Sequence, residues 1–208
     1  RDRRPDAPLP LRLESPFSLR HRLRELSWRA PLVACSAYVA EGVVAAGVAP
    51  SRVRVIHPIP PEIEAPLVAR PRAPRLLAVG QLIRGKGFDL AVDALAHLPG
   101  AVTLTLAGDG PDRPALEARA HRVAPGRVHF AGYVTPAAIE ALYDAASVIL
   151  VPSRWPEPFG MVGVEAMRRG RPVVGAAHGG IPEWLGPESG GLLVPPGDPA
   201  ALARAALA

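Results

Sequence analysis

The sequence of 208 residues contains a single cysteine, Cys35, and few aromatic residues, only 5% of the total. One cysteine cannot form an internal disulfide or a cluster of thiolate metal ligands. No uninterrupted apolar run reaches the roughly 18 to 20 residues that a membrane-spanning helix needs, which argues against a transmembrane protein. Cys35 lies in a short apolar stretch, and we expect it to be a small core residue.

Lysine is almost absent, since Lys86 is the only lysine among the 24 basic residues. The formal net charge is +5, and most of the excess of Arg over Asp and Glu lies in residues 1–30. A charge that is so small and so local does not indicate a nucleic-acid-binding protein. An ammonium and a guanidinium are not interchangeable at a phosphate site, so Lys86 stands out as a candidate phosphate ligand.

The sequence is otherwise rich in core material, because apolar residues make up 49% of it. Six short apolar runs predict strands at Arg75–Val79, Val102–Leu106, Arg127–Phe130, Ser147–Val151, Pro172–Gly175 and Gly191–Val194. Helical patterns alternate with them near residues 87–98, 112–124, 135–146, 160–170 and 180–186, and another begins at Asp198. The alternation predicts an α/β fold, a Rossmann-like doubly wound parallel sheet with helices on both faces and a ligand crevice at the carboxyl ends of the strands.

Three regions follow from the pattern. Residues 1–57 hold one βαβ-like unit, which we interpret as the incomplete tail of an N-terminal domain. Residues 58–74 contain many prolines and predict a stiff interdomain linker. Residues 75–208 contain the six predicted strands and form a second, Rossmann-like domain. Near the start, a short basic helix presents a leucine stripe, which we expect to pack on protein, with an anionic membrane surface as the alternative.

The first candidate site is the loop Gly80-Gln-Leu-Ile-Arg-Gly-Lys86-Gly87 between a strand and a helix. Its glycines allow close backbone approach, and a helix amino end offers free N–H groups to an anion. Lys86 would reach a phosphate as a point charge. As a residue of a surface loop, it should contribute less than about 0.5 kcal/mol to folding.

The second candidate site is the segment from Ser153 to Met167, which follows the fourth predicted strand. Glu157 lies in a Pro-bounded loop, and Gly160 opens the next helix, with Glu165 about one and a half turns inside it. Carboxylates beside a helix start suit a ligand with both phosphate and hydroxyl groups. The alternative is that Glu157 caps the helix and Glu165 is solvated. Trp155 and Phe159 could line the pocket, although aromatics beside a sheet end usually pack.

These segments together resemble a known family. The motifs are Gly80 with Lys86-Gly87, Leu106-Ala-Gly-Asp109-Gly-Pro, Phe130-Ala-Gly-Tyr-Val134, Glu157-x7-Glu165-Ala and Pro172-Val-Val with Gly179-Gly-Ile-Pro-Glu183. In this order they are similar to the retaining GT-B glycosyltransferases of family 4, the glycosyl transferases group 1. The resemblance runs from about Leu32 to Ala208 and implies the C-terminal, donor-binding half of a GT-B fold.

The resemblance implies a role for each site residue. Lys86 matches the lysine that binds the donor diphosphate, and Glu157 and Glu165 match the glutamates at the sugar and ribose hydroxyls. The remaining donor-binding positions are Gly80, Gln81, Arg84, Tyr133, Val134, Phe159, Gly160, Met161 and Val162. Tyr133 and Val134 lie where the family places the nucleobase. Gln81 replaces the family's diphosphate-binding arginine, and Arg84 is our candidate substitute. We assign catalytic roles to Glu157 and Lys86.

The implied protein is a retaining glycosyltransferase with a nucleotide-diphospho-sugar donor and no metal or other cofactor. Its acceptor, which the resemblance leaves unknown, would bind to the missing N-terminal domain, so this chain alone should transfer little or nothing. We expect a cytoplasmic protein with no nucleic-acid partner, and with membrane contact at the inner face only through its basic N-terminal segment. A nucleotide-sugar epimerase, a sugar phosphorylase and a non-catalytic nucleotide-sugar-binding module are the alternatives.

Overall fold

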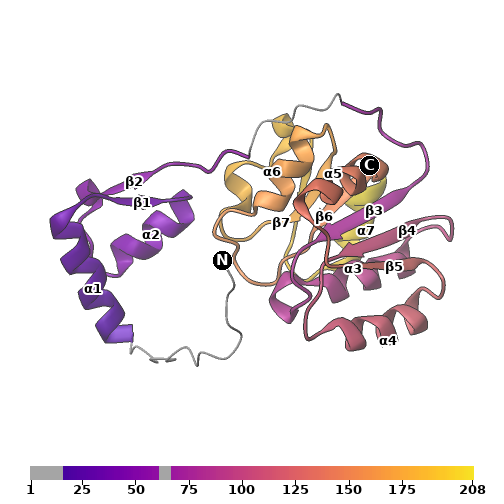
Figure 1. Ribbon diagram of the computed structural model, residues 1–208, viewed down its shortest axis with the longest axis horizontal. Coiled ribbons are helices and arrows are strands. Elements are labelled where there is room, and N and C mark those ends of the chain that lie inside the picture. The colour runs from indigo at the N-terminus through magenta and orange to yellow at the C-terminus, as the bar shows by residue number, and fades with distance from the viewer. Residues whose placement is uncertain (1–15, 61–66) are drawn as a thin grey trace.

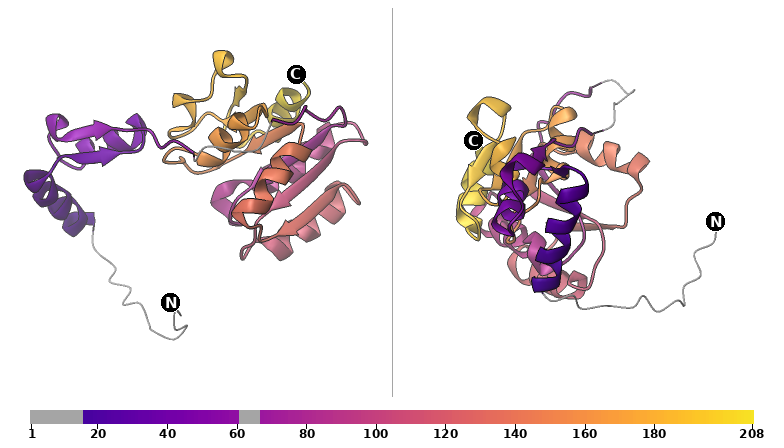
Figure 2. Two further views of the ribbon diagram at one scale, coloured as in Figure 1. Left: turned by 45° about the horizontal axis from the view of Figure 1, so that its top comes forward. Right: turned by 90° about the vertical axis from the view of Figure 1, so that its left-hand side faces the viewer.

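The computed structural model describes residues 16–60 and 67–208 (Figure 1). The first part of the predicted N-terminal region and the centre of the predicted linker therefore lie outside the described residues. Within the described ranges, the chain forms a small N-terminal segment and a larger α/β unit (Figure 2).

The larger unit is built on six parallel strands in the order β5-β4-β3-β6-β7-β8. The strands are β3 (Arg75–Val79), β4 (Thr103–Ala107), β5 (Val128–Gly132), β6 (Val148–Val151), β7 (Val173–Ala176) and β8 (Leu192–Val194). The chain runs outward from β3 to β5 and then returns to β6 on the other side of β3. Such a reversal leaves a crevice at the carboxyl ends of β3 and β6. The predicted doubly wound parallel sheet is confirmed.

Helices cover both faces of this sheet. One face carries α3 (Phe88–Ala94), α4 (Arg113–Val123) and α7 (Pro199–Leu207), and the other carries α5 (Pro136–Ala145) and α6 (Met161–Arg168). Because successive strand residues point to opposite faces, Leu76 and Ala78 of β3 join the first core and Leu77 joins the second. The buried strands are apolar on both faces, as a sheet sandwiched between helices requires.

Short 3₁₀ turns occur in both parts of the structure, and one of them corrects a sequence prediction. They are η1 (Pro50–Arg52), η2 (Arg84–Lys86), η3 (Leu95–His97), η4 (Ile181–Glu183) and η5 (Pro187–Ser189). The helix predicted near residues 180–186 is only the single turn η4. The backbone is already extended at Gly186, and Pro187 follows, so the helix cannot continue.

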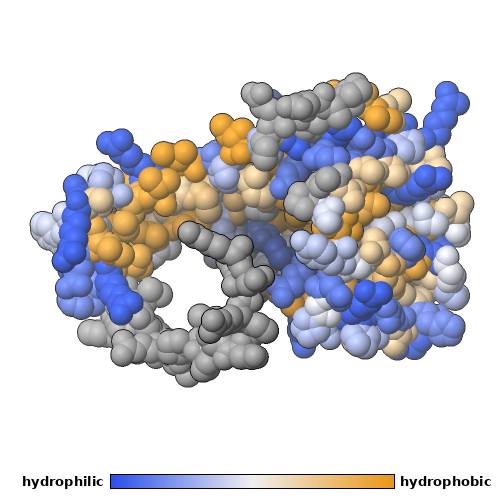
Figure 3. Space-filling view, viewed as in Figure 1, coloured by the Kyte–Doolittle hydropathy of each residue, from blue (hydrophilic) through white to orange (hydrophobic). Residues whose placement is uncertain are grey.

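The N-terminal segment consists of α1 (Pro16–Arg29), β1 (Leu32–Ala34), α2 (Ala37–Ala45) and β2 (Val53–Val55), with β1 and β2 paired in parallel. In the predicted leucine stripe of α1, Leu23 is half-buried and Leu26 is 54% exposed, so packing of the stripe on protein stays a prediction. Trp28 in the same helix is 85% exposed. Apolar surface gathers over this segment in Figure 3, because two helices and two three-residue strands are too few to bury it. No helix in the described ranges is long and apolar enough to cross a membrane.

Candidate functional site

Two adjoining cavities open at the carboxyl ends of β3 and β6, and Val79 at the end of β3 lines both. The Glu157 pocket has a volume of about 360 Å³ and includes the predicted residues Lys86, Glu157, Phe159, Gly160, Met161 and Val162. The Glu165 pocket has a volume of about 550 Å³ and includes Gly80, Gln81, Tyr133, Val134 and Glu165. The fold thus brings all but one of the predicted site residues to one crevice.

Arg84 is the predicted residue that lies elsewhere. It is exposed and lines a separate hollow together with Asp89, Asp112 and Arg119. It belongs to the same turn, η2, as Lys86, but Lys86 lines the Glu157 pocket and Arg84 does not. Arg84 therefore does not take the place of the arginine that the family has where this chain has Gln81.

In the Glu157 pocket, the Glu157 carboxylate is held by three protein donors. Its Oε1 accepts hydrogen bonds from Lys86 Nζ at 2.7 Å, Ser153 Oγ at 2.6 Å and Trp155 Nε1 at 3.2 Å. Its Oε2 accepts a second bond from Lys86 Nζ at 3.0 Å. Glu157 does not cap α6, whose N-cap residue Gly160 has no side-chain cap bond. Lys86 is thus the partner of a buried carboxylate, and the expectation of a loosely attached surface lysine is wrong.

The backbone around Glu157 is fixed by the two glycines that follow β7. Gly180 N donates to Glu157 O at 2.8 Å, and Gly179 pairs with Glu157 in an isolated parallel bridge. Gly179 has a φ of +65°, and a Cβ there would lie 2.3 Å from Glu157 O. Only glycine permits this conformation and this approach without strain. The Gly179-Gly180 pair therefore seats the Glu157 loop against the sheet end.

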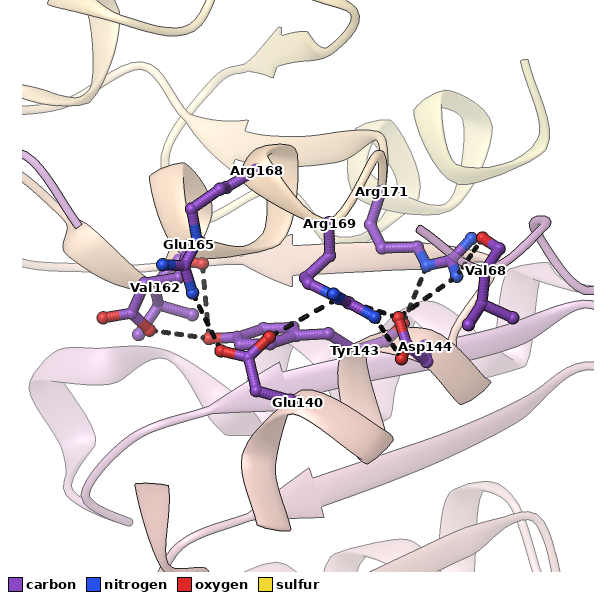
Figure 4. Close-up of polar contacts among 9 residues, drawn as sticks. All are labelled: Val68, Glu140, Tyr143, Asp144, Val162, Glu165, Arg168, Arg169 and Arg171. Atoms are coloured by element: carbon purple, nitrogen blue, oxygen red, sulfur yellow. Dashed lines mark hydrogen bonds and ion pairs between the residues drawn. The ribbon is translucent and has the colours of Figure 1, made fainter. Parts of the chain in front are cut away.

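Glu165 is held differently, by one buried tyrosine of α5 (Figure 4). The Tyr143 hydroxyl donates to Glu165 Oε2 at 2.9 Å, and it lies 3.5 Å from Val162 O. Burial, followed by the charges of Glu165 and Glu140, raises the pKa of Tyr143, so its hydroxyl stays protonated and acts as a donor. Glu165 is therefore oriented by the protein rather than freely solvated, and it lines the pocket that bears its name.

Two buried arginines lock α5 against the turn that follows α6 (Figure 4). Arg169 and Arg171 are each almost fully buried, and Arg169 Nε donates to Asp144 Oδ1 at 2.9 Å. Arg171 donates from Nε to Tyr143 O at 2.9 Å and from Nη2 to Val68 O at 2.8 Å. These contacts fix the backbone at Tyr143 and Asp144. They therefore also hold Tyr143 at hydrogen-bond distance from Glu165.

The N-terminal segment docks beside the Glu157 pocket through Glu183. The Glu183 carboxylate accepts the N–H groups of Ala37 at 2.8 Å and Tyr38 at 2.9 Å, and lies 3.2 Å from His57 Nε2. Burial tends to raise the pKa of Glu183, but the hydrogen bonds from Tyr38, Ala37 and His57 outweigh it and lower the pKa. Docking brings Cys35 to the pocket wall, where it is only half-buried, so the expectation of a core cysteine is wrong.

Sequence reasoning did not assign Ser153, Tyr143 or Glu183 to the site, and it favoured plain packing for Trp155. A signal existed for Tyr143, since a tyrosine on the buried face of a helix needs a partner for its hydroxyl. The donors to Glu157 carried no such signal, because their convergence depends on how two distant loops meet.

The arrangement suits a ligand that carries both an anionic group and hydroxyls. Lys86 offers positive charge, and the N–H groups of the first α6 turn, at Met161 and Val162, have no partner within the helix. Glu157 and Glu165 offer oxygens that accept from hydroxyls. Within the described ranges, no group of three or more His, Cys, Asp or Glu residues is placed to hold a metal ion, and metal independence stays a prediction.

Comparison with known proteins gives consistent matches. The profile of the glycosyl transferases group 1 family matches residues 73–208. The chain is 34% identical over 131 residues to an uncharacterized glycosyltransferase of Methanocaldococcus jannaschii (62% of this chain, 33% of the relative). It is 37% identical over 157 residues to the D-inositol 3-phosphate glycosyltransferase of Xylanimonas cellulosilytica (70% of this chain, 37% of the relative).

Solved structures share the fold. HepE of Anabaena, solved with UDP, superposes with a TM-score of 0.80 at 26% identity and covers 92% of this chain and 57% of its own. HepE has also been solved with UDP-glucose, with a TM-score of 0.78. The sucrose-phosphate synthase of Thermosynechococcus elongatus gives a TM-score of 0.74 at 29% identity, with 96% of this chain and 53% of its own covered. The chain thus spans about a third to somewhat over half of the length of these relatives.

Proposed function

Because this chain belongs to the glycosyl transferases group 1 family and has the fold of the C-terminal part of GT-B enzymes, we propose that its crevice binds a nucleotide-diphospho-sugar. The protein would transfer the sugar to an acceptor with retention of anomeric configuration. The observation that carries the proposal is the pairing of two adjoining pockets, one holding Lys86 with Glu157 and the other holding Glu165.

Each part of the donor has a partner in this proposal. Lys86 and the first-turn N–H groups of α6 bind the diphosphate, and Glu157 accepts from the sugar hydroxyls. Glu165 accepts from the ribose hydroxyls, while Tyr133 and Val134 at the far side of the Glu165 pocket contact the base. Tyr133 is 79% exposed, which leaves its ring available to a ligand.

The chemical contribution of this domain is positioning and electrostatics. As the bond between sugar and diphosphate breaks, negative charge grows on the leaving diphosphate, and Lys86 with the α6 N–H groups stabilises it. Glu157 holds the sugar in the orientation that the acceptor requires. Gln81, which lines the Glu165 pocket, offers a hydrogen-bond donor but no charge, so Lys86 carries the cationic role.

Acceptor recognition is proposed to involve a segment outside the 208 residues, because the chain covers only 57% of the HepE chain. By itself the 208-residue chain should bind donor and transfer the sugar slowly or not at all. Incubation with UDP-glucose that carries a radiolabel in its glucose, followed by separation of the labelled products, measures this, because hydrolysis releases free glucose and transfer places the label on an acceptor.

The binding step is tested by titrating the 208-residue chain with UDP, GDP and ADP and with UDP-glucose. UDP comes first because HepE, at 26% identity, has been solved with it. A ligand at a hundredfold excess over its Kd raises the free energy of unfolding by about 2.7 kcal/mol, which a melting curve resolves. If no nucleotide at millimolar concentration moves the melting temperature, the proposed donor site is wrong.

A further inference from the structure

An aromatic side chain beside the Glu157 pocket, Trp155, contacts both of the charged groups that line it. Trp155 Nε1 donates to Glu157 Oε1 at 3.2 Å, and the Trp155 ring lies 5.6 Å from Lys86 Nζ, within the range of a cation–π contact. The side chain is 43% exposed, so it lies at the protein surface and not in the core.

The same tryptophan is pressed against the loop that carries Lys86. A Cβ on Gly85 would lie 2.5 Å from two ring atoms of Trp155. The backbone N–H groups of Arg154 and Trp155 both donate to Gly85 O, at 2.9 and 3.2 Å. Arg154 also pairs with Asp89 in the first turn of α3, with Nη2 and Oδ2 2.5 Å apart. The loops that follow β3 and β6 are thus clamped together at one point.

We propose that Trp155 is a positioning residue that sets the distance and orientation between Lys86 and Glu157 for the diphosphate and the sugar of the donor. This rests on the proposed function. Its indole N–H orients the Glu157 carboxylate, its ring face holds the Lys86 ammonium, and its contact with Gly85 fixes the Lys86 backbone. Glu165 lies in the adjoining pocket and does not depend on this clamp.

The structure offers two independent ways to disturb the clamp. Trp155→Phe keeps an aromatic ring and removes the N–H donor. Gly85→Ala leaves Trp155, Lys86 and Glu157 unchanged but places a methyl group where the indole ring lies. Trp28→Ala is the matched control, since Trp28 is 85% exposed in the N-terminal segment and does not line the pocket.

The experiment measures the affinities of the 208-residue chain and of each variant for UMP and UDP-glucose by calorimetry, with melting curves for stability. Trp155→Phe should bind UDP-glucose about threefold more weakly, and Gly85→Ala about tenfold, while UMP affinity stays within about twofold in both. Trp28→Ala should bind both ligands unchanged. A merely structural role for Trp155 would lower both affinities together with the melting temperature.

Tryptophan fluorescence gives a second readout. The chain has three tryptophans, and UDP-glucose should change the emission of the unaltered chain and not that of Trp155→Phe. The inference is overturned if both clamp variants bind UDP-glucose like the unaltered chain, or if UMP affinity falls equally. If the unaltered chain binds neither ligand, the proposed function itself fails and this inference falls with it.

Discussion

The two glutamates of the crevice lie eight residues apart, yet the protein holds them in opposite ways. Glu157 is on an irregular loop, and Lys86, Ser153 and Trp155 together contact both of its oxygens. Glu165 is on a helix, and Tyr143 contacts one of its oxygens. Within the described residues, no protein donor contacts Glu165 Oε1, which leaves that oxygen available to a ligand.

This difference between the two glutamates implies that Glu157 contributes to both folding and ligand binding, whereas Glu165 contributes mainly to ligand binding. A buried carboxylate paired with an ammonium contributes to folding as well as to the site, because either partner alone is costly. A carboxylate oriented by one hydroxyl at the edge of a pocket serves mainly the ligand. The comparison implies that a bound donor must draw Lys86 partly away from Glu157. Glu165, in contrast, is already oriented by Tyr143 before the donor binds.

The largest expected effect is the loss of Lys86. Lys86→Met leaves Glu157, whose side chain is 8% exposed, without its cation. We expect the free energy of unfolding to fall by about 2 kcal/mol, somewhat less than for a fully buried pair because the Lys86 side chain is 28% exposed. UDP affinity should drop at least about tenfold. Urea unfolding and calorimetry measure the two effects.

Lys86→Arg is the control for this variant. If positive charge were sufficient, Arg would restore both stability and affinity, as every other basic residue here is already Arg. We expect partial rescue of UDP affinity, because a planar guanidinium does not replace a compact ammonium beside Trp155. Full UDP affinity in Lys86→Met would remove Lys86 from the site.

The second prediction separates the two carboxylates by ligand. Glu165→Gln should weaken UDP and UDP-glucose alike, by about 1.5 to 3 kcal/mol, which is the range for a hydrogen bond to a charged group. Glu157→Gln should weaken UDP-glucose by a similar amount and UDP by less. Calorimetry on both variants with both ligands measures this. Equal losses throughout would contradict the assignment of ribose and sugar.

The third prediction concerns the support of Glu165. Tyr143→Phe removes the hydroxyl and keeps the buried ring, so UDP affinity should fall by about 1 kcal/mol. The effect should vanish when Glu165 is already Gln and persist when Glu157 is Gln, and a double-mutant cycle measures both. A Tyr143 effect that adds fully to Glu165→Gln would mean that the hydroxyl acts on general packing alone.

The smallest expected effect is a dependence on acid pH. The lowered pKa of Glu183 means that its docking bonds are fully present above its ordinary pKa and are lost as the pH falls through the lowered value. Docking places Cys35 at the Glu157 pocket, so as the pH falls from about 5 to about 3 UDP-glucose should lose more affinity than UMP, by below about 1 kcal/mol. Glu183→Gln should remove this extra dependence. The same pH profile in both proteins would show that Glu183 plays no part.

Much of the fold and of the candidate site could be predicted from local sequence patterns. Each apolar run is flanked by turn residues, and helices alternate with strands, so the parallel sheet and its crevice follow from the order of elements. The loop with Lys86 and the segment from Glu157 to Glu165 each follow a strand, so their meeting at one sheet edge follows as well. The wrong predictions for Arg84, Lys86 and Cys35 depend on contacts between distant segments. The length of η4 had a local signal in Pro187, which we did not use.

What the sequence by itself determined is the fold class and the place of the two glutamates, because hydrophobic period and strand order depend on neighbours along the chain. Only the tertiary structure decided which groups hold them. Arg169 and Arg171 look like a basic surface run in the sequence, yet both are buried against Asp144 and the backbone of α5. The contact between Trp155 and Gly85 likewise depends on the packing of two loops that are far apart in the sequence. Such partners come from segments tens of residues apart, and only packing brings them within hydrogen-bond distance.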